Sequence, residues 1–210
     1  MDSQMATDSS MELNELNGCF WKHLSFLREI LAIIDSHVDG IEKWNRDNEN
    51  DAEFYDDIIY SEVGLGFAAC QQFMESVRCN WGVDKKTALS KGPEVGGKKV
   101  ACAINTAANC WKHQAEWDNK DKLSSNAKKT REEIKNLGFD PDKLDTPYEI
   151  LGLLTANTKR MGDLLPILFN WANDISEYAI KNGTCEKTGW WKKACGLGDL
   201  PMSDSTGLEI

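Results

Sequence analysis

Apolar residues recur at alternating spacings of four and three along the first part of the chain. The seam runs through Leu24, Leu27, Leu31, Ile34, Val38 and Ile41, and it extends back through Leu13, Leu16 and Phe20. This spacing places all of its members on one face of an α-helix. No proline precedes Pro93, so no residue of that kind interrupts the helix. The sequence therefore predicts a long amphipathic helix over residues 11–48, ended by the polar run 45–51.

Helical patterns continue through the rest of the chain, and no segment alternates in the manner of a strand. Gly138 is placed to end one helix, Thr146–Glu149 reads as a capping box with proline at the first turn, and Pro166 either kinks the last helix or marks its start. The further predicted helices cover 52–80, 98–118, 125–137, a segment starting at 146, and 158–182. We therefore expect an all-α, up-and-down bundle of four to six helices, in which the first two form a long hairpin.

The domain limits follow from composition. Residues 1–10 are polar and are expected to be disordered, 11–183 form a single helical-bundle domain, and 184–210 form a partly disordered tail whose Trp190–Trp191 pair folds onto the body. Residues 82–97 are rich in glycine and lysine and predict a loop longer than the usual connection. Gly64 and Gly66 are expected to let another helix approach closely.

Charge is distributed unevenly along the 210 residues. Residues 1–62 hold 15 acidic and 4 basic residues, whereas residues 78–135 hold 13 basic and 7 acidic ones within a chain of net charge −10. An acidic shell around a basic middle argues against non-specific binding to duplex DNA but permits a local phosphate-binding surface. The longest apolar run is about five residues, which is too short to cross a membrane, and the N-terminus is unlike a secretory signal. The expected location is the cytoplasm.

Seven cysteines are scattered with no C-x-x-C pair, which is typical of small buried side chains in a cytosolic protein. A zinc site built from Cys102, Cys110 and His113 is conceivable, but the spacing matches none of the usual ligand signatures. No metal and no cofactor are predicted.

The predicted helix over residues 98–118 divides into two faces. Val100, Ile104, Ala107, Ala108, Trp111 and Ala115 gather on the side expected to face the core. Cys102, Asn105, Asn109, His113 and Glu116 gather on the other side at spacings of three and four. Asparagine and glutamate side chains can hold an imidazole in one tautomer, and imidazole exchanges protons near neutral pH. The same stripe is also typical of an exposed helix face without a function. The sequence leaves both the proton-transfer site and the exposed face open.

Asn109-Cys-Trp-Lys-His113 resembles the second half of the signature of HEPN-domain proteins, in which arginine and a polar residue precede three variable residues and a histidine. The resemblance implies an all-α bundle, often a dimeric, metal-independent ribonuclease of bacterial toxin–antitoxin or phage-defence systems, with the motif histidines of two copies close together. Ala108 occupies the position of the family's arginine, with Lys112 as the substitute cation. This departure fits a degenerate regulatory relative equally well.

RNA carries its own nucleophile, the 2′-hydroxyl, so its cleavage needs only a proton-transfer group and a cation. We predict that His113 transfers the proton, that Lys112 supplies the cation and that Asn109 orients the substrate. Basic residues of the preceding segment, Lys85, Lys86, Lys91, Lys98 and Lys99, are expected to follow the nucleic-acid backbone. The alternative is a non-enzymatic interaction or antitoxin protein that binds a basic partner through its acidic N-terminal helices. RNA, a protein partner or a second copy in a homodimer are the expected partners.

Overall fold

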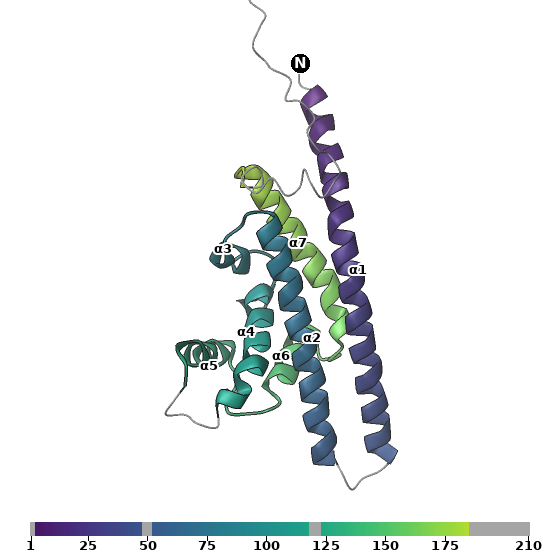
Figure 1. Ribbon diagram of the computed structural model, residues 1–210, viewed down its shortest axis with the longest axis vertical. Helices are drawn as coiled ribbons and strands as arrows, with labels where there is room; N and C mark the ends of the chain where they lie inside the picture. Colours follow the sequence, from purple (N-terminus) through teal and green to yellow (C-terminus); the bar gives the residue numbers. More distant parts are fainter. Residues whose placement is uncertain (1–2, 48–51, 118–122, 185–210) are drawn as a thin grey trace, which may run out of the picture.

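The computed structural model describes residues 3–47, 52–117 and 123–184, and this part of the chain is almost entirely helical (Figure 1). Its α-helices are α1 (Ser3–Asp47), α2 (Ala52–Asn80), α3 (Lys85–Leu89), α4 (Val100–His113), α5 (Ser125–Leu137), α6 (Thr146–Leu154) and α7 (Leu164–Lys181). Two 3-10 helices, η1 (Gln114–Glu116) and η3 (Met161–Asp163), extend α4 and precede α7. The all-α prediction is confirmed, and α3 brings the number of helices in the described part to seven.

The long hairpin is formed by α1 and α2, which run antiparallel side by side (Figure 1). The seam residues from Leu24 to Ile41 are all buried, and each is 8% exposed or less. At 1.5 Å per residue, α1 is about 68 Å long, and its N-terminal turns extend beyond the other helices (Figure 1). It includes Ser3–Ser10, where the sequence predicted disorder. No glycine or proline precedes Gly18, so the chain lacks a residue that would end the helix there.

Helix α4 lies at the centre of the bundle, packed against α2, α5 and α6. Its residues Ile104, Ala107 and Ala108 are fully buried. The glycines of α2 allow neighbouring side chains to come close, as predicted. A Cβ atom on Gly64 would lie 2.1 Å from Cδ1 of Trp111, and one on Gly66 would lie 2.7 Å from Cε of Met161.

The segment 82–97 is more regular than the loop that the sequence predicted. Asp84 caps α3 by accepting a hydrogen bond from the Thr87 amide at 3.0 Å. Two short antiparallel strands follow, β1 (Glu94–Val95) and β2 (Lys98–Lys99). Trp171 of α7 anchors the segment, because its Nε1 donates to the Ala88 carbonyl at 3.0 Å. The missed signals are the aspartate cap and the distant tryptophan.

The predicted capping box at Thr146 is wrong. The N-cap of α6 is Asp145, without a side-chain hydrogen bond to the helix. The Thr146 hydroxyl instead donates to the carbonyls of Asp140 and Lys143, at 2.7 and 2.9 Å, and Glu149 pairs with Lys159 at 2.9 Å. The preceding loop thus satisfies Thr146 before the helix begins.

Other helix ends follow the sequence signals. Gly138 ends α5 with a φ of 93°, and Gly183 follows α7 with a φ of 61°. Pro166 lies in the first turn of α7, so it marks the start of that helix. Trp190 and Trp191 lie outside the described residues. Within those residues, no helix is both long enough and apolar enough to cross a membrane.

We expect Gly64→Ala to destabilise the protein by about 1–3 kcal/mol, because the new methyl group would overlap the Trp111 ring and force repacking. The matched control is Gly40→Ala in α1, where a Cβ atom meets nothing within 4 Å. This control is expected to stabilise by about 0.5–1 kcal/mol through helix propensity alone. Urea unfolding followed by circular dichroism measures both changes. Similar effects at the two positions would contradict the close packing of α2 against α4.

Candidate functional site

A cavity of about 660 Å³ opens between α3, α4 and α5. One wall is the stripe of α4, contributed by Cys102, Asn105, Asn109 and His113. The remaining lining comes from Lys85, Lys86, Leu89 and Ser90 on one side, from Lys99 of β2, and from Asn126, Lys129, Thr130 and Glu133 of α5. The polar stripe is therefore recessed between helices rather than lying on an open face. Asn105 is only 6% exposed.

Five of the eight side chains predicted for the site line this cavity, namely Lys85, Lys86, Lys99, Asn109 and His113. The other three lie elsewhere. Lys91 places its ammonium group 4.5 Å from the ring centroid of Tyr178. Lys98 lines a neighbouring cavity of about 260 Å³, and Lys112 is bonded to Gln71. The roles predicted for all eight residues stay predictions.

His113 is held by a carboxylate. Its Nδ1 lies 2.7 Å from Oε1 of Glu116, one helical turn further along the chain. The Ser124 hydroxyl donates to Oε2 of the same glutamate at 2.8 Å and also accepts from the Ala127 amide at the start of α5. In the neutral ring, a proton on Nδ1 shared with the carboxylate leaves the lone pair on Nε2. In this tautomer, Nε2 is the ring nitrogen that can accept a proton.

The hydrogen bond from His113 lowers the pKa of Glu116, and the bond from Ser124 lowers it further. Both bonds favour the ionised carboxylate, which is the form that accepts from Nδ1. Glu116 is therefore charged at neutral pH.

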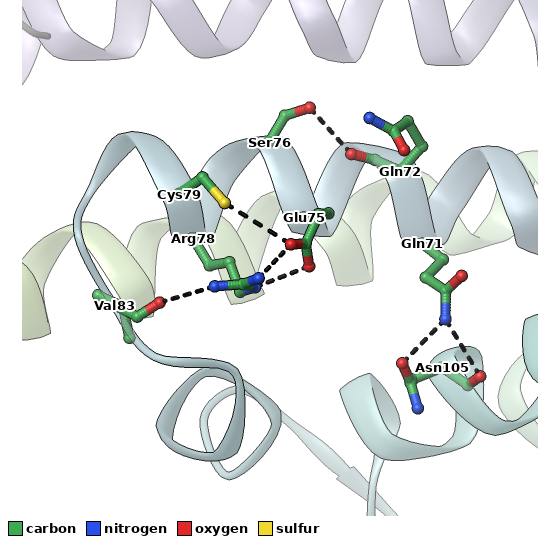
Figure 2. Close-up of polar contacts among 8 residues, drawn as sticks. All are labelled: Gln71, Gln72, Glu75, Ser76, Arg78, Cys79, Val83 and Asn105. Carbon is green, nitrogen blue, oxygen red and sulfur yellow. Dashed lines mark hydrogen bonds and ion pairs between the residues drawn. The ribbon is translucent and has the colours of Figure 1, made fainter. Parts of the chain in front are cut away.

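An amide network connects the wall of the cavity to α2. Gln71 of α2 donates through Nε2 to Oδ1 of Asn105 at 2.9 Å and to Oδ1 of Asn109 at 3.0 Å (Figure 2 shows the bond to Asn105). The Lys112 ammonium donates to Oε1 of Gln71. Burial lowers the pKa of Lys112, and the positive charge of Lys85 lowers it further. The two lysines are therefore close enough for their charges to interact.

The cavity is electropositive. Four lysines and one glutamate line it, and this glutamate, Glu133, lies 3.7 Å from the Lys129 ammonium. Lys99 pairs with Glu94 outside the cavity at 3.0 Å. Within the described residues, no ion pair joins Lys85 or Lys86 to a carboxylate. Unpaired ammonium groups beside amide and hydroxyl groups suit an anionic ligand such as a phosphate.

The sequence missed the α5 side of the cavity, above all Lys129, and the contribution of Gln71. The start of α5 does have a sequence signal, because Ser124 is a typical N-cap residue and its side chain caps the helix. Which face of α5 turns toward α4 depends on the packing of Ala127, Thr130 and Ile134, which no local pattern reveals.

The two cysteines near the cavity are Cys110, which is buried, and Cys102, which is half-buried. Burial raises the pKa of Cys110 to about 12, and burial followed by the charge of Glu133 raises the pKa of Cys102. Because the thiolate is the form that binds zinc, these two thiols are poor ligands. Among the described residues, no group of three or more His, Cys, Asp or Glu side chains is placed to hold a metal ion.

No family model matches the chain, and no curated protein or solved structure is significantly similar to it. What the cavity does is therefore inferred from its own residues.

The pairing of Glu116 predicts a titration that NMR of the side-chain carboxyl carbon can follow. We expect its pKa to lie below the ordinary value, and His113→Ala to raise it more than Ser124→Ala, because the histidine bond has the larger effect. The lowered pKa stabilises the fold above the pKa of the unfolded chain, and this contribution is lost as the pH falls through the folded pKa. A carboxyl pKa unaffected by either substitution would contradict the pairing.

Proposed function

We propose that the cavity between α3, α4 and α5 binds single-stranded RNA and that His113 cleaves it without a metal ion. The observation that carries this proposal is the placement of His113. Its Nδ1 is held by Glu116, and its ring lines the same cavity as Lys85, Lys86 and Lys129. A proton-transfer group and a set of cations therefore face one ligand.

The reaction needs few protein groups. Nε2 of His113 takes the proton from a ribose 2′-hydroxyl, the 2′-oxygen forms a bond to the adjacent phosphorus, and the bond from phosphorus to the 5′-oxygen breaks. The leaving oxygen takes a proton from one of the cavity ammonium groups, and the products are a 2′,3′-cyclic phosphate and a 5′-hydroxyl. The lysines also stabilise the negative charge that gathers on the phosphorane oxygens.

The size of the cavity is consistent with such a substrate. Its volume of about 660 Å³ lies within the range of pockets that enclose small ligands. One or two nucleotides are of this size, with the rest of the strand outside.

The resemblance to HEPN-domain proteins suggests the biological setting, a bacterial or phage conflict system. Ala108, at the position of the family's arginine, belongs to the buried core, so the cations of the proposed site come from α3, β2 and α5 instead. A degenerate regulatory relative would bind RNA in the same cavity without cleaving it. A homodimer that brings the two His113 side chains together is part of the same proposal, and light scattering after size exclusion measures it.

The proposal predicts that His113→Ala lowers the rate of RNA cleavage by roughly 10²–10⁴-fold, the range expected for losing a general acid–base group. The matched control is His37→Ala. His37 also pairs with a glutamate, Glu62, at 2.9 Å, but it lies on α1 and does not line the cavity. Cleavage of a labelled RNA with excess EDTA present gives the rates.

Equal rates for the two variants would remove the catalytic role of His113. Binding of the same RNA without cleavage by the wild-type chain would support the regulatory relative instead. Expression in bacteria complements the assay, since growth inhibition relieved by His113→Ala and not by His37→Ala identifies a toxic nuclease.

A second candidate function is the docking of a basic protein partner, and a second cavity favours it. This cavity, of about 570 Å³, lies at the end of the α1–α2 hairpin and is lined by Glu42, Asp56 and Arg46 and by the rings of Tyr60 and Tyr148. The two ring centroids are 5.8 Å apart, and the Tyr148 hydroxyl donates to Glu42 at 3.2 Å. Carboxylates beside aromatic rings bind lysine and arginine side chains.

The electrostatic field at this cavity is negative. Burial and then the charge of Glu42 raise the pKa of Tyr148 to about 12. Burial raises the pKa of Tyr60, and Asp56 and Asp145 raise it further. The ammonium of Lys159 already lies 4.1 Å from the Tyr148 ring centroid, so one face of that ring attracts a cation within the chain itself.

If this cavity docks a basic partner, Asp56→Asn is expected to weaken binding of a short arginine-rich peptide by about fivefold or more, because a close charge pair is lost. The control Glu29→Gln removes the same charge from an exposed position on α1 and is expected to change binding less than twofold. Fluorescence anisotropy with a labelled peptide provides both values. If the two variants weaken binding equally, the peptide responds only to net charge and the docking site is excluded.

A further inference from the structure

We infer that Lys112 is a positioning residue, and that through Gln71 it turns the amides of Asn105 and Asn109 so that both present N–H groups to a phosphate oxygen of the ligand. The inference rests on the proposed function of the cavity and specifies which part of an RNA lies against which residues. It also assigns Lys112 a role other than that of the cation at the reacting phosphate.

The first step is the chemistry of Lys112. An ammonium group only donates hydrogen bonds, whereas a glutamine amide carries an acceptor at one end and a donor at the other and can be turned by half a revolution. Because Lys112 donates to Gln71, the oxygen of that amide faces Lys112. The nitrogen of Gln71 is then left to donate to Asn105 and Asn109, which precede Lys112 on the same helix, α4.

The second step carries this direction from Gln71 to the two asparagines. Nε2 of Gln71 has two hydrogens, and it approaches Oδ1 of Asn105 at 2.9 Å and Oδ1 of Asn109 at 3.0 Å. The side-chain oxygens of both asparagines therefore point toward Gln71 and accept its hydrogen bonds. Figure 2 shows the nitrogen of the Asn105 side chain directed away from Gln71. Among the described residues, no group accepts a hydrogen bond from Nδ2 of either asparagine.

The third step concerns what the cavity offers to a ligand. Asn105 and Asn109 both line it, so their Nδ2 groups add donors to the ammonium groups of Lys85, Lys86 and Lys129. A cavity wall made of donors beside cations matches a phosphate oxygen, which only accepts. Asn109 precedes His113 by four residues on the same helix face, so a phosphate bound there lies about one turn from the imidazole.

Lys112 itself is not part of the cavity lining. A direct phosphate contact and a positioning role therefore have different consequences. Loss of a lysine that contacts phosphate reduces the salt dependence of RNA binding, because fewer counterions are released. Loss of a positioning lysine weakens binding and leaves that dependence unchanged.

The experiment measures the binding of a fluorescein-labelled single-stranded RNA over a range of KCl concentrations. The RNA is about 12 nucleotides long, which is within the site sizes of proteins that bind single-stranded nucleic acid. Lys112→Arg keeps a donor-only group and is expected to bind within about twofold of the wild type, whereas Lys112→Met binds roughly fivefold to tenfold more weakly with the same salt slope. Lys85→Met, in the cavity, is expected to reduce the slope by about 0.7.

A second pair of variants tests the direction of the amides. Glutamate at position 71 only accepts, so Gln71→Glu turns both asparagines and presents their oxygens to the phosphate. Binding is then expected to weaken by tenfold or more. Gln72→Glu is the control, because it adds the same charge at the next residue, which is exposed and lines no part of the cavity. Thermal unfolding by circular dichroism verifies that every variant is folded.

The outcomes separate this inference from the proposed function. If Lys112→Met lowers the salt slope as Lys85→Met does, Lys112 contacts phosphate directly and the positioning role is overturned while RNA binding stands. If Gln71→Glu and Gln72→Glu bind alike, the direction of the amides has no effect and the inference is overturned. If the wild-type chain binds no RNA, the proposed function fails and the inference falls with it.

Discussion

The structure depends on the close approach of α4 to α2. Gly64 leaves room for the Trp111 ring at a distance that no side chain would permit, and Gly66 does the same for Met161. Because a packed interior does not absorb an extra methyl group without strain, Gly64 fixes how closely α4 approaches α2, and Gly66 does the same for η3. The depth of α4 then determines that its polar stripe faces neighbouring helices rather than solvent. Asn105 is buried only because α2 supplies Gln71 as its partner, which removes the cost of an unpaired buried amide.

The candidate site follows from that central helix. α3 and α5 flank α4 and bring lysines to a wall that carries amides and an imidazole, although these residues come from separate parts of the chain. The segment 82–97, which the sequence predicted to be a loop, contributes most directly to the cavity, because α3 places Lys85 and Lys86 in its lining. Trp171 of α7 holds this segment in place through its bond to Ala88. The regular structure of this segment is therefore a consequence of its contact with a residue that is distant in the sequence.

Two cavities of opposite character lie in the same bundle. The end of the α1–α2 hairpin combines carboxylates with tyrosines, whereas the cavity of α3, α4 and α5 combines ammonium groups with amides. The net charge of −10 averages over both and describes neither. Since exposed charges are screened beyond about 8–10 Å at moderate salt, each cavity is governed by its own neighbourhood. A chain that is acidic overall can thus hold a phosphate-binding site.

The sequence by itself determined the helices other than α3. The seam from Leu24 to Ile41 required a long amphipathic α1, and Gly138 and Gly183 set two helix ends, because periodicity and backbone conformation are local properties. It also singled out His113 and Asn109 through their spacing on one helix face. The tertiary structure decided the rest. It bonded the Thr146 hydroxyl to the preceding loop instead of a capping box, set Lys112 against Gln71, and placed Lys129 of α5 in the lining of the cavity that His113 also lines. These outcomes depend on which faces of distant segments pack together, and that choice is made by the shape and volume of the whole core, which no local pattern contains.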